Sequence, residues 1–524
     1  MEKKLSLRHI FSSDIAIISY LALGKLFLHL AVAGNYGYFR DELYYISCSK
    51  HLALGYVDHP PLSIFLLAMA RFLFGDSLFS IRLFSSLAGA SFVFFTGLIA
   101  RELGGKIFSQ ITACVSVIVA GTYLSMNSFY SMNALDYLFW AMGTYIVIRI
   151  IKTHDDKLWM GFGIVVGLGL LNKYSMLFFV AGLLAGILFT SHRKEFLNKW
   201  FWIGGFIAFI IFLPHIIWQI LNGYPSLEFM RNASQYKNLA MTPLSFLLGQ
   251  VFTMNTITAP IWLFGLYYYF FKKEGRPYRL FGWIFVVVFI IMITSKAKLY
   301  YFAPAFFIVF ASGSVLLEKL LRKIRWNWPK PILMTVITII MITRGVNIAP
   351  FTIPVLTVEN FIKYAESKKA RTTREEVHEL GVLPQHFSDM FGWEKMAATI
   401  AGVYTTLTGE ERSQCVIYAR NYGEAGAINF FGEKYGLPRA ICGHNSFWLW
   451  GPGNRTGKTT IFIGRESNIK RSYDDLKQHY DSVEHVATLK CNYCMQYENN
   501  VPVFVCRRPN FSFQKEWLHF KSYI

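Results

Sequence analysis

The first two thirds of the sequence consist largely of apolar runs as long as a lipid bilayer is thick. Most of the runs before residue 350 have about 17–25 residues, the helix length that crosses a hydrocarbon core. The chain of 524 residues is 54% hydrophobic and only 16% charged, whereas about a quarter of a typical soluble chain is charged. We therefore predict a polytopic membrane protein that is mainly α-helical.

The apolar runs predict about eleven membrane spans before a hydrophilic C-terminal part. The first run has no small-residue cleavage site, so we interpret it as a membrane helix rather than a signal peptide. Two neighbouring runs, 158–171 and 174–190, are short and could form one broken helix. The expected spans are 14–33, 81–101, 107–124, 134–151, 158–171, 174–190, 201–220, 244–271, 280–294, 299–317 and 331–349.

Positive charge predicts the orientation of these spans. Every second loop carries Lys or Arg, as in Arg193-Lys194 and Lys272-Lys273, whereas the opposite loop Ser125–Asn133 carries none. Because basic loops stay in the cytoplasm, we expect a cytoplasmic N-terminus and a C-terminal domain, residues 350–524, on the periplasmic side of a bacterial inner membrane. Most of the net charge of +20 lies before residue 350, so it reflects orientation and not nucleic-acid binding.

Costly polar side chains gather at the ends of spans that this orientation places outside. Charged groups beside a membrane are expensive unless they face water or a partner. Their shared location predicts one outward-facing polar cavity in the transmembrane domain, residues 1–349. The side chains are Asp41, Glu42, Asp58, His59, Asn133, Asp136, Asn172, Lys173, His215, Gln219, Lys296 and Lys298.

The first outer loop, residues 34–80, holds the most distinctive of these groups. Asp41 and Glu42 lie on a short amphipathic run that predicts a surface helix. A carboxylate there could accept a proton from an attacking hydroxyl, although an acidic pair also favours a helix N-terminus by itself. Asp58-His59 precedes Pro60-Pro61, which starts a run, 62–74, too short to span.

These motifs, in this order, resemble the dolichyl-phosphate-mannose protein mannosyltransferase-like family, which includes the aminoarabinose transferases acting on lipid A. The resemblance covers roughly residues 10–320 and implies the GT-C fold and polyprenyl-phosphate sugar donors. It is carried by Asp41-Glu42, by Asp58-His-Pro-Pro-Leu62, by Arg82-Leu-Phe-Ser-Ser-Leu-Ala-Gly, by Asn133-Ala-Leu-Asp136, by Leu171-Asn-Lys-Tyr174, and by Lys296-Ala-Lys-Leu-Tyr-Tyr301 with Pro304.

The resemblance also implies roles for single residues. Asp41 matches the catalytic acid of the first loop, Glu42 would support it, and direct attack on the anomeric carbon would invert its configuration. Cations would stabilise the charge that grows on the leaving phosphate. In the aminoarabinose branch a lysine stands where this chain has His59, so Lys173 or Lys296 would take its role. The donor-site candidates are Asp58, His59, Arg82, Asp136, Lys173, Lys296, Lys298 and Tyr300.

Structural explanations stand beside these assignments. The outer lysines could snorkel to the interface, and Asp136, one turn into its span, could be a buried acid with a structural partner. No cofactor is implied with certainty. A divalent cation is possible, but Asp41, Asp58 and Asp136 could hold it only if the three converge.

From Pro350 the composition is that of a small soluble α/β domain. Its glycine-rich segment Gly451–Thr459 has the wrong spacing for a phosphate-binding loop and precedes a strand. Cys491-x-x-Cys494 lacks a second pair at zinc spacing, and an outer compartment permits disulfides. We expect strands at 414–419, 440–442, 459–463, 485–489 and 501–506, and helices at 423–435 and 473–480.

The sequence thus favours an integral-membrane glycosyltransferase. It would move a sugar from a polyprenyl-phosphate donor to a lipid, glycan or protein acceptor at the outer face of the membrane that holds it. The alternative is a transporter or flippase of a lipid-linked substrate, which predicts internal repeats with broken helices that the sequence does not display. An oligosaccharyltransferase is a third reading, but the tail lacks the Trp-Trp-Asp signature of such enzymes.

Overall fold

The computed structural model describes residues 13–236, 241–295, 297–324, 329–369, 381–464 and 469–524. The chain divides into two compact units. Unit 1 comprises Met1–Ala33, Arg82–Ile217 and Ala240–Leu356, and unit 2 comprises Gly34–Ile81, Trp218–Leu239 and Thr357–Ile524. The loop that the sequence predicts as the first outer loop, residues 34–80, therefore belongs to the same unit as the hydrophilic C-terminal part.

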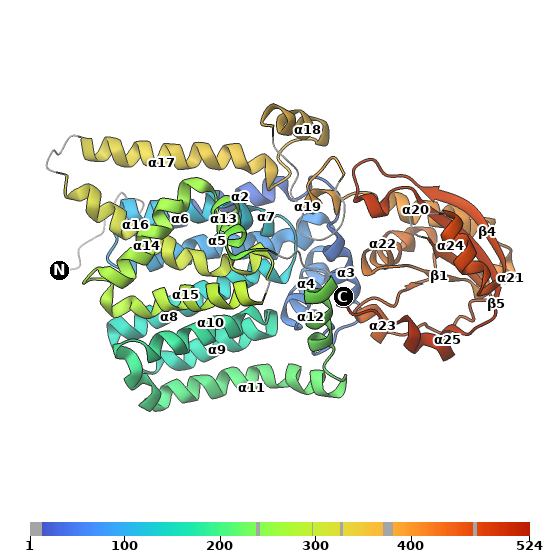
Figure 1. Cartoon of the computed structure of the whole chain (residues 1–524), viewed down its shortest axis with the longest axis horizontal. Coiled ribbons are helices and arrows are strands. Elements are labelled where there is room, and N and C mark those ends of the chain that lie inside the picture. The colour runs from blue at the N-terminus through green and yellow to red at the C-terminus, as the bar shows by residue number, and fades with distance from the viewer. Residues whose placement is uncertain (1–12, 237–240, 296, 325–328, 370–380, 465–468) are drawn as a thin grey trace. The chain divides into compact units, whose positions relative to one another are not determined.

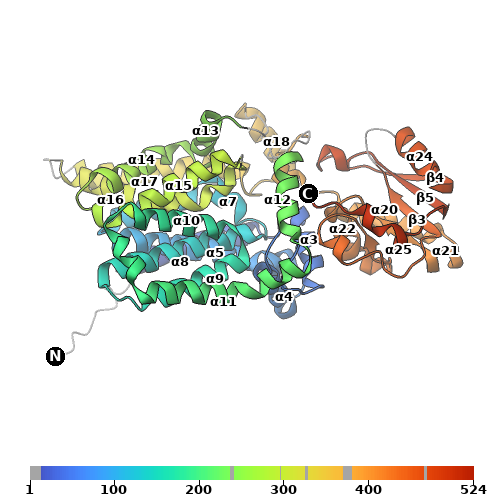
Figure 2. The same cartoon turned by 60° about the horizontal axis from the view of Figure 1, so that its bottom comes forward.

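Unit 1 is a bundle of apolar helices. Figures 1 and 2 both show α8, α9 and α10 running side by side. The helices are α2 (Asp14–Val32), α5 (Leu78–Glu102), α6 (Ile107–Val119), α7 (Gly121–Met126), α8 (Met132–Thr153), α9 (Leu158–Asn172), α10 (Ser175–Leu188), α11 (Lys199–Leu221), α13 (Pro243–Thr253), α14 (Ala259–Phe271), α15 (Arg279–Thr294), α16 (Phe306–Arg322) and α17 (Pro329–Ile348).

The described residues contain seven helices long and apolar enough to cross a membrane, or up to nine if each of two bent pairs counts as one span. Several of these helices expose large apolar side chains. Phe206 on α11 is 63% exposed and Val346 on α17 is 66% exposed, which is unfavourable in water and suits contact with lipid. The prediction of a mainly helical membrane protein is confirmed, and the number of eleven spans stays a prediction.

Two expected spans are interrupted. The span 244–271 is not one helix, because α13 and the segment Thr256–Phe271 meet at a bend of 98°. At the break, Asn255 has a φ of 70° and donates its Nδ2–H to Val119 O at 3.1 Å. The span 107–124 is likewise broken at Ala120, between α6 and α7. By contrast, α9 and α10 are separate helices, as the sequence predicts.

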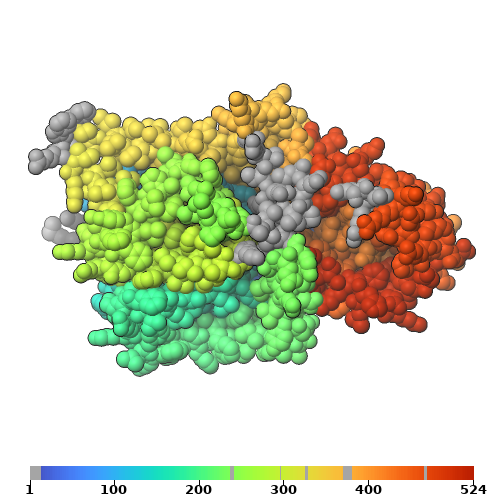
Figure 3. Space-filling model, viewed as in Figure 1, coloured from blue at the N-terminus to red at the C-terminus, as the bar shows by residue number. Residues whose placement is uncertain are grey.

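Glycines let several helices of unit 1 approach each other closely, as is common in membrane bundles. A Cβ on Gly163 of α9 would lie 2.1 Å from Gly204 O of α11. A Cβ on Gly313 of α16 would lie 1.8 Å from Ile261 O of α14. Only a glycine permits such backbone contact, so these positions fix the packing of the bundle. In Figure 3 the teal and yellow-green helices form a continuous side-chain surface on the face in view.

Unit 2 combines helices with one mixed sheet of five strands in the order β2-β1-β3-β5-β4. Strands β2, β1 and β3 are parallel, and β3, β5 and β4 are antiparallel. The strands are β1 (Val416–Tyr418), β2 (Ala440–Ile441), β3 (Thr459–Ile463), β4 (Tyr480–Leu489) and β5 (Val501–Pro509). The helices are α3 (Arg40–Ser49), α4 (Leu62–Phe74), α12 (Pro225–Tyr236), α18 (Val358–Ser367), α19 (Gln385–Ser388), α20 (Trp393–Thr406), α21 (Gly409–Gln414), α22 (Tyr422–Phe431), α23 (Ser446–Leu449), α24 (Ile469–Lys477) and α25 (Phe513–Glu516).

All five predicted strands of the soluble part are present, so the α/β class of this part is confirmed. Several boundaries differ by a few residues, and the largest strand difference is at β4, which begins at Tyr480 rather than 485, after α24 has ended at Lys477. Tyr480 pairs with Pro509 and is buried against Phe504, so sheet pairing and burial override the local helical pattern. The glycine-rich segment leads directly into β3, which confirms the predicted strand there.

Candidate active site

Helix α3 positions the two acids of the first outer loop differently. Glu42 is fully buried, and its Oε2 accepts a hydrogen bond of 2.8 Å from the backbone N–H of Phe39, the residue that caps the helix. Asp41, one residue earlier, is half-buried, and its Oδ1 accepts a hydrogen bond of 2.9 Å from Tyr422 Oη–H. Among the described residues no hydrogen bond or ion pair reaches Asp41 Oδ2. Glu42 therefore holds the start of α3, while Asp41 keeps one carboxylate oxygen available.

Asp58 is fixed by a hydroxyl network in unit 2. The Tyr44 hydroxyl donates to Asp58 Oδ1 at 2.7 Å. It lies 2.8 Å from Ser446 Oγ, which in turn accepts from the N–H of Val57 at 3.2 Å. Burial and the nearby Asp58 carboxylate raise the pKa of Tyr44 well above its ordinary value. The tyrosine therefore remains a hydrogen-bond donor to Asp58 at all physiological pH values.

His59 lies in an aromatic enclosure without an exposed atom. Its ring is 4.6 Å from that of Tyr45 and 5.0 Å from that of Tyr56, measured between centroids. Nδ1 donates to Pro60 O at 3.0 Å, and among the described residues Nε2 has no hydrogen-bond partner. The structure thus shows His59 held by packing. The resemblance implies instead that a residue at this position contacts the sugar donor.

In unit 1, three sequence motifs that are far apart in the chain meet around Lys173. Its Nζ donates to Asn133 Oδ1 at 2.7 Å and lies 3.5 Å from Asp136 Oδ2. The same ammonium lies 5.7 Å from the ring centroid of Tyr300 and 5.2 Å from that of Tyr301, within the range of cation–π attraction. Lys173 and Asp136 are both buried, so their charges are compensated by each other and by these polar and aromatic neighbours.

Asp136 has a second partner that the sequence did not indicate, because the Ser175 hydroxyl donates to its Oδ1. Arg82, also in unit 1, is buried and donates to Ala33 O at the end of α2 at 2.8 Å. Lys298 is half-buried and precedes the 3-10 turn Leu299–Tyr301. Of the predicted donor-site residues, unit 1 therefore brings Asp136, Lys173 and Tyr300 together, while Lys296 lies outside the described residues.

Sequence reasoning missed the hydroxyl partners of the acids. Tyr422 is 381 residues from Asp41, and Ser446 is 402 residues from Tyr44. A local signal exists only for Tyr422, which follows the helix-capping Asn421 and so occupies the first turn of a predictable helix. No group of three or more His, Cys, Asp or Glu side chains suited to a metal ion occurs in the described part of the chain.

Three comparisons bear on these features. Residues 58–218 match the sequence model of the dolichyl-phosphate-mannose-protein mannosyltransferase family. The crystal structure of ArnT from Cupriavidus metallidurans bound to undecaprenyl phosphate superposes with a TM-score of 0.59 at 13% identity, covering 94% of this chain and 97% of ArnT. Part of this chain, residues 58–218, therefore matches this family, and the chain as a whole has the ArnT fold. The apo structure of ArnT gives a TM-score of 0.58, so the family resemblance and the GT-C fold predicted from the sequence are confirmed.

A curated relative of this chain is the lipid A galacturonosyltransferase RgtD of Rhizobium johnstonii. It is 22% identical over 299 residues, which cover 56% of this chain and 62% of RgtD. The aligned part thus spans less than two thirds of RgtD's length. Together with the family match it relates the chain to glycosyltransferases.

Proposed function

We propose that this chain is an integral-membrane glycosyltransferase that moves a sugar from a polyprenyl-phosphate donor to a lipid, glycan or protein acceptor. The observation that carries the proposal is the buried cluster of Lys173, Asp136 and Asn133 in a fold shared with an undecaprenyl-phosphate-bound protein. A buried lysine among such partners is pre-placed to meet an anionic phosphate. The flippase alternative finds no support in the matched family, so we do not pursue it.

Lys173 is the cation that we assign to the donor phosphate. An ammonium has three N–H donors. Within the described residues Asn133 accepts a hydrogen bond from one of them, and Asp136 Oδ2 lies 3.5 Å away as an ion-pair partner. A remaining N–H can donate to a phosphate oxygen. We assign Arg82, Lys298 and Lys296 as further cations. We assign Tyr300 to the lining of the donor site, where its ring contacts the Lys173 ammonium.

Asp41 is the group that we assign as general base. Its Oδ1 is held by Tyr422, and Oδ2 accepts the proton of the acceptor hydroxyl as that oxygen attacks the anomeric carbon. The bond between the anomeric carbon and the phosphate oxygen breaks, and its electron pair leaves with the polyprenyl phosphate. One direct displacement inverts the anomeric configuration. We assign Glu42, Asp58 and His59 to positioning, because each is fixed by its own contacts in unit 2.

The test is sugar transfer by the purified full chain in lipid vesicles. Release of polyprenyl phosphate is measured with a panel of polyprenyl-phosphate sugars and with lipid, glycan and protein hydroxyl acceptors. Asp41→Asn should lower the rate by about 10²–10⁴-fold, the usual contribution of a general base. Asp474→Asn, which changes an exposed acid of the same unit, should leave it unchanged. Full activity of Asp41→Asn would contradict the assignment of Asp41 as the general base. Transport of the lipid-linked substrate without sugar release would favour a flippase.

We further propose a bacterial inner-membrane location with a cytoplasmic N-terminus. In this arrangement residues 1–349 form the membrane domain, and residues 350–524 form a domain on the periplasmic side. The support is that every second loop carries Lys or Arg, whereas the opposite loop Ser125–Asn133 carries none. Reporter fusions at Lys272 and at Ile524 should report opposite sides of the membrane, and reports from the same side would overturn the assignment.

A further inference from the structure

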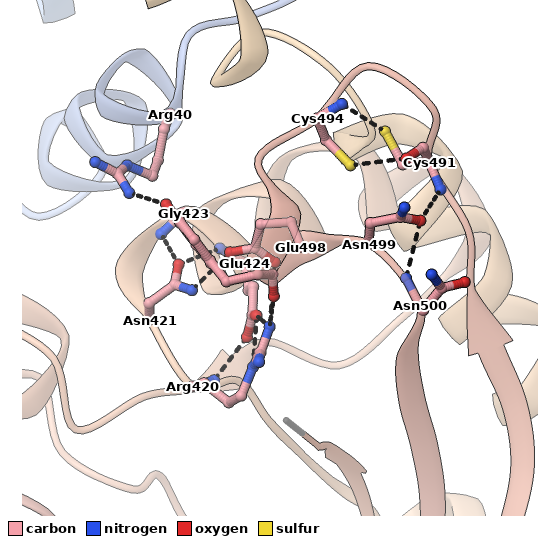
Figure 4. A network of polar contacts seen from close by, with 11 residues as sticks. Arg40, Arg420, Asn421, Gly423, Glu424, Cys491, Cys494, Glu498, Asn499 and Asn500 are labelled. Carbon is pink, nitrogen blue, oxygen red and sulfur yellow. Dashed lines mark hydrogen bonds and ion pairs between the residues drawn. The ribbon is translucent and has the colours of Figure 1, made fainter. Parts of the chain in front are cut away.

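Two cysteines of unit 2 form a local pair in the segment between β4 and β5. The backbone N–H of Cys494 donates to Cys491 Sγ at 3.2 Å, and the Cys494 thiol donates to Cys491 O at 3.4 Å (Figure 4). Cys491 is partly exposed, whereas Cys494 and the other five cysteines of the chain are buried. All seven are thiols, so the disulfides that the sequence permitted are not formed here. Cys491 is therefore the thiol that a reagent in solution can reach.

The two thiols differ in acidity. Interaction with the Cys494 side chain, backbone N–H groups and the charge of Lys395 lower the pKa of Cys491 to about 6, against the opposing effect of burial. The same interaction and burial raise the pKa of Cys494. A buried cysteine elsewhere in the unit, Cys415, has its pKa raised by burial to about 11. An accessible thiolate beside a protonated buried thiol is the arrangement of an attacking and a resolving cysteine.

A small hollow, open to solvent, lies beside this pair. It is lined by Phe391, Gly392, Trp393 and Lys395 as well as by both cysteines. A Cβ on Gly392 would lie 3.1 Å from Cys491 Sγ, so a glycine is what keeps the sulfur uncovered on this side. The exposed lysines at positions 395 and 490 make the rim positive.

The segment that carries the pair also holds the start of α3. Three residues after Cys494, the Tyr497 hydroxyl accepts a hydrogen bond from Arg40 Nη1. Arg40 is the first residue of α3 and precedes Asp41. The shape of the segment is fixed on its other side by Asn499, whose Oδ1 accepts from the backbone N–H of Cys491 at 3.0 Å (Figure 4).

Glu498, the residue after Tyr497, holds the start of α22. Its Oε1 accepts from Asn421 Nδ2 at 2.9 Å, and its Oε2 accepts from Arg420 Nη2 at 3.2 Å. Asn421 is the N-cap of α22, since its Oδ1 accepts from the N–H of Glu424 at 3.1 Å. The first residue of α22 is Tyr422, the partner of Asp41. A change in the shape of the cysteine segment therefore acts on both neighbours of the proposed base.

We propose that Cys491 and Cys494 are a redox-active dithiol that exchanges with external disulfides, and that the segment Met495–Glu498 transmits its oxidation state to α3 and α22. The Cys491 thiolate attacks a small-molecule or protein disulfide, which forms a mixed disulfide and expels one thiolate. Cys494 then loses its proton to solvent and attacks Cys491 Sγ, which expels the second thiolate. The two cysteines lose two electrons and two protons, and the external disulfide becomes two thiols.

Exchange is tested on the purified full chain in buffers of reduced and oxidised glutathione, followed by alkylation and mass spectrometry of the peptide with both cysteines. We expect a reversible transition between dithiol and disulfide, and alkylation of Cys491 with a half-maximal rate near pH 6 rather than near pH 8.5. Cys494→Ser should accumulate a mixed disulfide with glutathione at Cys491, and Cys491→Ser should not react. A disulfide that never forms, or one that glutathione never reduces, would overturn the exchange proposal.

Transmission is tested by hydrogen exchange of residues 39–49 and 422–431 in both oxidation states, a readout that does not depend on catalysis. Because the disulfide removes the bond from the Cys494 thiol to Cys491 O, we expect exchange to be about two- to fivefold faster in the oxidised form. Tyr497→Phe should abolish the difference in residues 39–49 and keep it in 422–431, since Glu498 is unchanged. Equal exchange in both states of the wild type would refute transmission.

The effect on sugar transfer rests on the proposed function and is measured separately. If Asp41 is the base, the oxidised chain should transfer sugar more slowly than the reduced chain, and the double variant Cys491→Ser/Cys494→Ser should not respond to glutathione. A chain that exchanges disulfides and shows the difference in hydrogen exchange, but has no transferase activity, would support the dithiol proposal and contradict the proposed function.

Discussion

At the scale of single residues, Lys173 shows how a buried charge can serve both structure and chemistry. Its ammonium contacts Asn133, Asp136 and two tyrosine rings. Such contacts compensate the cost of burying the charge. The same contacts hold the N–H groups of the lysine in place before a phosphate arrives, so these donors are preformed. A single substitution cannot separate these two roles, so a pair of variants is needed.

Lys173→Met should lower sugar transfer by about 10²–10³-fold, in the range seen when one stabilising donor is removed. It should also destabilise unit 1 by about 3–5 kcal/mol, since Asp136 would be left buried without its cation. The double variant Lys173→Met/Asp136→Asn removes both charges and should recover the stability but not the activity. Thermal unfolding and release of polyprenyl phosphate measure the two effects, and a fully active double variant would contradict the donor role.

The residue scale also shows where sequence reasoning reaches its limit. The half-exposed Asp41 and the fully buried Glu42 are neighbours in an acidic pair, and the sequence proposed both a catalytic and a helix-starting role for that pair. The fold places the helix-starting contact on Glu42. The hydroxyl of Tyr422 could not be predicted, because its contact with Asp41 joins residues 381 positions apart.

At the scale of elements, the contact of α3 with α22 depends on small residues. A Cβ on Gly426 would lie 2.9 Å from the backbone carbonyl carbon and oxygen of Leu43. A Cβ on Gly423 would lie 2.5 Å from Arg40 Cγ. The two helices therefore touch through backbone, and this contact keeps Tyr422 at hydrogen-bond distance from Asp41.

Gly426→Ala should destabilise unit 2 by about 1–3 kcal/mol, the usual cost of an extra methyl group in a packed contact. It should also slow sugar transfer, because α3 must move away from α22. Gly402→Ala is the matched control, since a Cβ on this α20 glycine meets nothing within 4 Å. Helix propensity alone should stabilise that variant by up to about 1 kcal/mol. Chemical unfolding compares the two variants, and equal effects would contradict the packing argument.

Apolar periodicity predicted most helices of unit 1 but not their breaks. The span expected at 244–271 is apolar over most of its length, so its hydropathy predicts one helix, although Asn255 and Pro260 are local break signals at the 98° bend. The bend is fixed by the side chain of Asn255, which reaches Val119 from a left-handed backbone conformation. Breaks of this kind depend on a tertiary partner, whereas the Pro60-Pro61 start of α4 is encoded locally and was predicted at the right residue.

At the scale of the whole molecule, the two units carry different kinds of polar chemistry. In unit 1, the buried Lys173 faces one buried acid, Asp136. In the described part of unit 2, two buried acids, Glu424 and Glu498, form ion pairs with the same cation, Arg420. A site with two carboxylates and one guanidinium leaves one negative charge in excess. Protonation of one acid relieves this excess. We therefore expect the stability of unit 2 to depend on pH.

Burial and the charge of Glu424 raise the pKa of Glu498 well above its ordinary value. The folded chain therefore holds a proton that an unfolded glutamate, with a pKa of about 4.3, has lost. The stability from this group is complete below that value and is lost as pH rises through the folded-state pKa, with a slope of at most about 1.4 kcal/mol per pH unit. Glu498→Gln should flatten this loss, because an amide supplies the N–H of the protonated acid at every pH.

Thermal unfolding of the wild type and of Glu498→Gln between pH 5 and pH 8 measures the effect. Cys491, whose pKa is lowered to about 6, acts in the opposite direction and gains stability as pH rises. Since Cys491 is present in both proteins, its contribution cancels in their difference. The control Glu410→Gln changes an exposed glutamate and should follow the wild type. If Glu498→Gln also follows the wild type, Glu498 is ionised in the folded chain, and Arg420 neutralises more of the pair than its single charge suggests.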